Sequence, residues 1–124
     1  MTRKLLSLSA GISLFVVAGI PAIAHHSISA EFDTSKSISF TGQVKKVDWG
    51  NPHIYTHVEA KEGDKVVVYK VEGAAPNDLF RRGSKQDDVK IGETVSVRGI
   101  RAKNPESTNI GSATITNAAG KRIF

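Results

Sequence analysis

Alternation of apolar and polar residues is the feature that most constrains the fold of this chain. It occurs in five short stretches after residue 36, most of them separated by glycine, proline, asparagine or aspartate. A period of two residues places successive side chains on opposite faces of a strand, so these stretches predict β-strands with one buried face. The expected strands cover residues 38–49, 53–60, 66–72, 94–102 and 109–117.

The first expected strand contains a change of phase. Phe40 and Val44 share one phase, whereas Val47 and Trp49 fall in the other. A phase change within one strand is typical of a β-bulge or a tight bend, and Gly42 lies at a suitable position for it. We therefore expect the first strand to be bent.

A short helix is predicted over Pro76–Arg82, between the third and fourth strands. Proline suits the first position of a helix, and Gly83 suits the left-handed residue that follows a helix. Three meander strands, a helix and two more strands predict an all-β fold, a five-stranded OB-like Greek-key barrel. The alternative is a flat meander with the helix on one face.

The apolar positions of the strands predict the core. Either Leu79 or Phe80 is expected to close one end of the sheet. The residues expected inside are Phe40, Val44, Val58, Val71, Val97 and Ile115.

The first 24 residues have the organisation of a secretory signal peptide. Arg3 and Lys4 precede an apolar run over residues 5–20, and Ala22-Ile23-Ala24 has the small-x-small pattern of a cleavage site. We expect cleavage after Ala24 and a periplasmic mature protein without a membrane span; a retained membrane anchor is the alternative. The expected organisation is a signal peptide at 1–24, an N-terminal arm at 25–36 and an OB-like barrel domain at 37–124.

Composition excludes several function classes. The chain has no cysteine, which rules out thiol chemistry and disulfides. Removal of Arg3 and Lys4 lowers the formal charge from +5 to +3, a small excess for a nucleic-acid-binding protein. No serine lies in a nucleophile-elbow context, and the acidic residues are scattered through turns. The sequence therefore predicts a protein that is not an enzyme.

The turn between the first two strands is the most suggestive candidate site. Gly50-Asn51-Pro52 favours a chain reversal, and alternation after it places His53, Tyr55 and His57 on one face. Such a face, next to the only tryptophan, predicts a ligand-binding surface. Its expected ligand-binding residues are Trp49, Asn51, His53 and Tyr55.

Histidines also suggest a metal site. After cleavage, the α-amine and imidazole of His25 can chelate one Cu(II) ion, and His26 or His53 supplies a further imidazole ligand. In the alternative interpretation His25 and His26 are simply solvated. His53 then holds the turn by a hydrogen bond to a backbone carbonyl.

Several motifs resemble a family of small exported bacterial proteins, the domain of unknown function 6152. They are Ala24-His25-His26-Ser27, Phe32-Asp33, Gly42, Val44, Trp49-Gly50-Asn51-Pro52-His53, Pro76 with Leu79, Arg82-Gly83, Ile91-Gly92 and Gly99-Ile100-Arg101-Ala102-Lys103. This chain has Ile28 where the family usually has phenylalanine, and Tyr69 near the position of a tryptophan in the third strand. The resemblance implies an exported, sheet-rich domain and no established activity.

Two functions follow as expectations. The first is a non-catalytic periplasmic binding module for a small ligand, a peptide or a periplasmic protein, which uses the turn near Trp49 and His53. The second is a periplasmic copper-binding protein that uses its histidine-led mature N-terminus.

Overall fold

The computed structural model describes residues 28–124, so the expected signal peptide, His25 and His26 lie outside the described residues. Most of the described chain is strand, which confirms the all-β prediction. None of its helices is long or apolar enough to cross a membrane. The elements are α1 (Ile28–Glu31), β1 (Phe32–Asp48), β2 (Tyr55–Glu62), β3 (Lys65–Glu72), α2 (Pro76–Arg81), the 3-10 helix η1 (Gln86–Asp88), β4 (Thr94–Ala102) and β5 (Asn109–Thr116).

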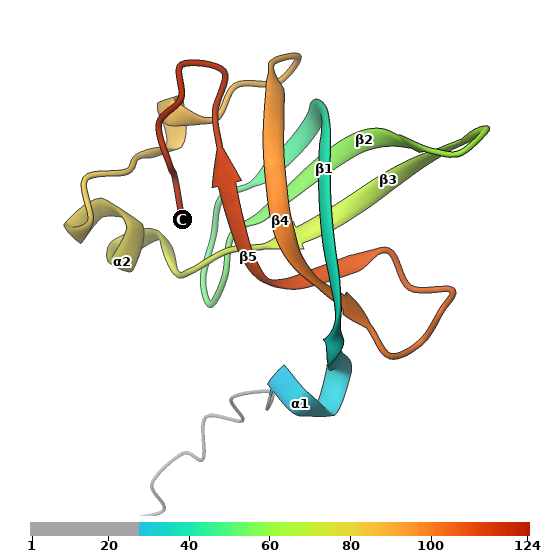
Figure 1. Cartoon of the computed structure of the whole chain (residues 1–124). Helices are drawn as coiled ribbons and strands as arrows, with labels where there is room; N and C mark the ends of the chain where they lie inside the picture. The colour runs from blue at the N-terminus through green and yellow to red at the C-terminus, as the bar shows by residue number, and fades with distance from the viewer. Residues whose placement is uncertain (1–27) are drawn as a thin grey trace, which may run out of the picture.

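The five strands form a closed barrel in the order β1-β2-β3-β5-β4, with β4 returning to β1 (Figure 1). All neighbouring pairs are antiparallel except β3 and β5, which are parallel over a short stretch. The long β1 takes part in two ladders: its first part pairs with β4 and its second part with β2. The β2–β3 hairpin extends beyond the rest of the barrel (Figure 1).

A bend in β1 allows this one strand to pair with both β4 and β2. The register of β1 with β2 shifts between Val44 and Lys46, which is the bulge that the phase change predicted. At Gly42 the backbone approaches β2 closely, because a Cβ atom there would lie 2.4 Å from the Glu59 carbonyl oxygen. Glycine is therefore required at the bend for space.

Strand β1 begins earlier than expected, because residues 32–36 of the expected arm form its first part. Phe32 pairs with Ala102 and is 4% exposed. Its ring fills the space over Gly111, where a Cβ atom would lie 2.6 Å from a ring carbon. Packing of one aromatic ring against a distant glycine thus extends the strand, and local sequence alternation does not reveal such a contact.

The core agrees with the prediction except at Phe40. Phe40 is only partly buried and packs on Tyr69, with ring centroids 4.5 Å apart. Leu79 of α2 is fully buried, whereas Phe80 is 75% exposed, so Leu79 alone closes the end of the barrel. The expected core residues that are buried are Val44, Val58, Val71, Val97 and Ile115.

The C-terminal residues complete the same end of the core. Ile123 and Phe124 are buried, and their backbones hydrogen-bond to that of Ile115 in β5. The Ser84 hydroxyl, after α2, donates to the Ile123 carbonyl at 2.9 Å. Helix α2 begins at Pro76 as predicted and ends at Arg81, one residue earlier than expected.

Candidate functional site

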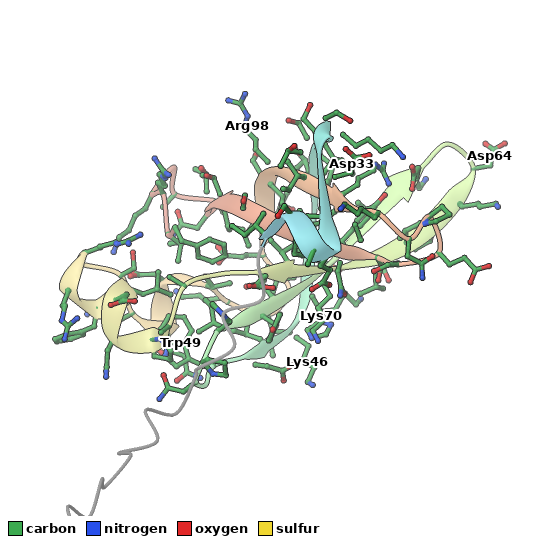
Figure 2. All side chains as sticks on the ribbon, turned by 90° about the horizontal axis from the view of Figure 1, so that it is seen from below. Asp33, Lys46, Trp49, Asp64, Lys70 and Arg98 are labelled. Atoms are coloured by element: carbon green, nitrogen blue, oxygen red, sulfur yellow. The ribbon has the colours of Figure 1, made fainter. Side chains whose placement is uncertain are left out.

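The predicted ligand-binding residues lie in and beside the turn that joins β1 to β2. Trp49 follows the end of β1 and is half-buried against the core, and Asn51 is exposed. Tyr55 begins β2 and pairs with Asp48. In Figure 2 the labelled Trp49, Lys46 and Lys70 lie on the same side of the molecule. The outer side of this turn and of the adjoining β1, β2 and β3 is called the turn surface below.

His53 connects the turn to the segment that follows β3. Its Nδ1 lies 3.0 Å from the Gly73 carbonyl oxygen, and because a carbonyl only accepts, Nδ1 carries the hydrogen. The backbones of Ile54 and Gly73 are also hydrogen-bonded, at 2.9 Å. The hydrogen bond from His53 to a backbone carbonyl is the one expected in the alternative interpretation, in which His53 holds the turn. It leaves Nε2 of His53 directed to Glu72, 3.7 Å from Oε1.

Tyr55 lies between charged side chains of β3. It pairs with Glu72 across the β2–β3 ladder, and the ammonium of Lys70 lies 4.1 Å from the centre of its ring, a cation–π contact. Burial raises the pKa of the Tyr55 hydroxyl, and the charges of Glu72 and Glu31 raise it further. The phenol therefore stays neutral and can donate a hydrogen bond to a ligand.

His57 shares the outward face of β2 with Tyr55, as predicted, whereas Thr56 and Val58 point into the core. Its Nε2 lies 2.9 Å from Asp48 Oδ2, and the Lys46 ammonium lies 2.7 Å from the other carboxylate oxygen. The hydrogen bonds from Lys46 and then from His57 lower the pKa of the Asp48 carboxyl. The imidazole of His57 is thus already bonded within the fold.

For metal binding, the turn surface supplies donors only in pairs. Within residues 28–124, no three histidine, aspartate or glutamate side chains lie close enough to hold a metal ion. His53 and Glu72 provide one imidazole nitrogen and one carboxylate oxygen at 3.7 Å. The other expected ligands, His25 and His26, lie outside the described residues.

Sequence reasoning missed three residues that shape this surface: Lys70, Glu72 and Gly73. The positions of Lys70 and Glu72 could have been predicted from the hairpin turn. A two-residue turn at Gly63-Asp64 sets the register in which Tyr55 faces Glu72 and His57 faces Lys70. Gly73 lies beyond the strand, and its contact with His53 depends on the path of the chain toward α2.

Comparison with known proteins gives one match. The model of the family of unknown function DUF6152 matches residues 14–112. The chain belongs to this family. No curated protein and no solved structure matches it. As a DUF6152 protein the chain thus has a family and a β fold, and its function has to be argued from its surfaces.

Proposed function

We propose that this DUF6152 protein is an exported, non-catalytic binding module of the periplasm, and that its ligand or partner contacts the turn surface. The observation that carries the proposal is a set of half-exposed rings held in fixed positions: Trp49 by the core, His53 by the Gly73 carbonyl and Tyr55 by Lys70. Rings fixed by the fold lose little side-chain entropy on binding. Exposed Asn51 adds an amide at the tip of the turn.

The topology supports an OB-like Greek-key assignment for this module. The order β1-β2-β3-β5-β4, the parallel β3–β5 pair and a helix between β3 and β4 agree with that fold. OB-folds bind ligands on strands 2 and 3 and on the loops that follow strands 1 and 4. The turn surface occupies the first of these loops and the adjoining strands, which is support by analogy of fold.

Export is the second part of the proposal. Its support is the arrangement of Arg3 and Lys4, the apolar run over residues 5–20 and Ala22-Ile23-Ala24. The mature chain then begins at His25 and works in the periplasm. Amino-terminal sequencing of the protein from a periplasmic extract should read His-His-Ser; recovery of the full-length protein from the membrane would contradict this part of the proposal.

Site-specific photo-crosslinking in the periplasm tests the binding proposal. The photo-reactive amino acid p-benzoylphenylalanine replaces Asn51 in one variant and Asn77 in the control. Both asparagines are exposed, and Asn77 lies on α2, which is not part of the turn surface. After irradiation in cells, intact-mass spectrometry should detect a discrete adduct, small or large, on the Asn51 variant only. Equal adducts on both variants would mean that contact with the turn is not selective.

Copper binding is a second candidate, favoured by the orientation of His53. A histidine whose Nδ1–H donates to a carbonyl presents Nε2 as a ligand, which is the usual arrangement of metal-binding histidines. Glu72 lies beside that nitrogen. Helix α1 is connected to this surface through Asn109 of β5. Asn109 Nδ2 donates to Glu31 of α1 at 2.8 Å, and Asn109 pairs with Lys70 of β3. The amine and imidazole of His25, with His26, would complete the set of ligands for Cu(II).

Fluorescence of the only tryptophan, Trp49, reports such binding because bound Cu(II) quenches nearby rings. In the cleaved protein, quenching should saturate and weaken below the imidazole pKa of about 6.5. His53→Asn should weaken the apparent affinity at least about tenfold. His57→Asn is the matched control, since that imidazole is bonded to Asp48. Extension of the N-terminus by one alanine removes the chelating amine; unchanged affinity in that variant and in His53→Asn would exclude this copper site.

A further inference from the structure

A polar depression lies on the outer face of β1, β4 and β5, on strand segments that are not part of the turn surface. It is open to solvent, its volume is about 420 Å³, and no acidic residue lines it. The side chains that line it are mostly hydroxyls and guanidiniums. These polar side chains are Ser37, Ser39, Ser112, Thr114, Arg98 and Arg122, and Ile38 and Ile100 also line the depression.

The strand registers bring these side chains together. Arg98 in β4 pairs with Ser39 in β1 on one side and with Thr114 in β5 on the other, so the three form one row across the sheet. Arg122 follows β5, pairs with Thr116 and places its Nη2 3.5 Å from the Thr114 hydroxyl. Both arginines are therefore neighbours of Thr114, Arg98 through strand pairing and Arg122 through its guanidinium.

Neither guanidinium is neutralised within the fold. Among the ion pairs of residues 28–124, none includes Arg98 or Arg122. Arg98 is exposed, and Figure 2 shows it pointing away from the body of the molecule. Two arginines without a carboxylate create a local positive potential. Their planar forks match the oxygen spacing of phosphate and carboxylate groups.

A β-bulge adds a hydroxyl to the same place. Arg98 pairs with Thr114 but Ile100 pairs with Gly111, so Ser112 and Ala113 together oppose a single residue of β4. Ser112 has a φ of 46°, and it is the one non-glycine residue with positive φ in the described part of the chain. This conformation is unfavourable for a residue with a side chain, and such strain gathers at functional sites. The bulge places Ser112 in the lining of the depression.

We propose that this depression binds a phosphate or sulfate group. Arg98 and Arg122 would hold its charge, and the hydroxyls of Ser39, Ser112 and Thr114 would donate further hydrogen bonds. Two guanidiniums and several hydroxyls offer more donors than the two oxygens of a carboxylate require, which favours a group with three or four oxygens. The proposal is independent of the turn surface and of any ligand bound there.

Titration with inorganic phosphate tests the site. The purified, ¹⁵N-labelled protein is followed by NMR at constant ionic strength, with sodium chloride replaced by sodium phosphate. Saturable shifts are expected at the amides of Ser39, Gly99 and Thr114. Arg98→Gln and Arg122→Gln should each weaken the affinity at least about tenfold, because each removes charged hydrogen bonds. Both residues are exposed, so neither change should alter the thermal unfolding midpoint.

Lys61→Gln provides the charge-matched control. Lys61 is exposed on β2, outside the three strands of the depression, and its replacement also removes one positive charge. Its effect on the affinity should stay below about twofold. An equal loss of phosphate affinity in Lys61→Gln and Arg98→Gln would show that net charge alone causes the effect, and it would overturn the proposal. Chemical-shift changes that are scattered over the whole surface when phosphate is added would also overturn the proposal.

Two further probes define the ligand class. Dimethyl phosphate represents the diester group carried by larger molecules, and inorganic phosphate represents the free ion or a monoester. Preference for either one supports the site and identifies the source of the phosphate. Acetate should bind at least about tenfold more weakly than phosphate, because it offers fewer oxygens to the donors. Acetate binding as tight as that of phosphate would contradict the proposed class.

Discussion

Leu79→Ala is expected to lower the free energy of unfolding by about 2 to 5 kcal/mol. Leu79 is fully buried at the end of the barrel, where it belongs to the same apolar cluster as Ile54, Ile123 and Phe124. Its truncation leaves a cavity that this end of the core can fill only in part. A loss of that size is a large part of the roughly 5 to 15 kcal/mol that stabilise a domain of this length. Chemical denaturation followed by circular dichroism measures it.

The neighbouring residue provides the control. Phe80 belongs to the same helix and is larger, but it is 75% exposed. Phe80→Ala should change the free energy of unfolding by no more than about 0.5 kcal/mol. Similar losses in the two variants would mean that helix α2, and not the burial of Leu79, determines the effect.

Gly42→Ala is expected to destabilise the fold by about 3 kcal/mol or more. The new methyl group would lie 2.4 Å from the Glu59 carbonyl oxygen and 2.8 Å from Cγ1 of Val58. The closest of these atoms belongs to the backbone of β2, which is held in the ladders with β1 and β3. Relief of the clash therefore requires the strands to separate at the bend.

Gly50→Ala is the matched control for this change. A Cβ atom at Gly50 would have nothing within 4 Å. Both substitutions restrict the unfolded chain to a similar degree, so the difference between them isolates the clash. Thermal unfolding of the two variants should show a much lower midpoint for Gly42→Ala and little change for Gly50→Ala. Equal midpoints would show that β1 and β2 are not in close contact at the bend.

The sequence predicted the parts of the fold that depend on local periodicity. Alternation after Pro52 placed Ile54, Thr56 and Val58 on one face of the second strand, and all three are buried. The phase change near Gly42 predicted the bulge. These features depend on the two-residue period of a strand, which a linear sequence records directly.

Features that depend on distant partners could not be predicted in this way. Phe32 extends β1 because its ring packs over Gly111, almost 80 residues later in the sequence. Phe40 has the phase of a core residue, but it packs on Tyr69 at the edge of the core. For Leu79 and Phe80, the residue pattern provided no basis for a choice, because a helix of six residues has too few turns to define a face.

The same distinction between local periodicity and distant partners applies to the candidate site. The common face of His53, Tyr55 and His57 followed from their spacing, but their bonding partners did not. His53 bonds to Gly73, after β3, and Asp48 bonds to His57 across the turn. In the polar depression, Arg98 and Arg122 are brought together by the order of β1, β4 and β5, so neither arginine marks the site in the sequence.

The central claim is that the turn surface is the place where this protein meets its ligand or partner. The comparison of photo-crosslinks from Asn51 and Asn77 measures it most directly, because both exposed asparagines carry the same probe in the same cells. We predict an adduct of defined mass at Asn51 and unmodified protein at Asn77. Adducts at Asn77 alone, or none at Asn51, would contradict the claim.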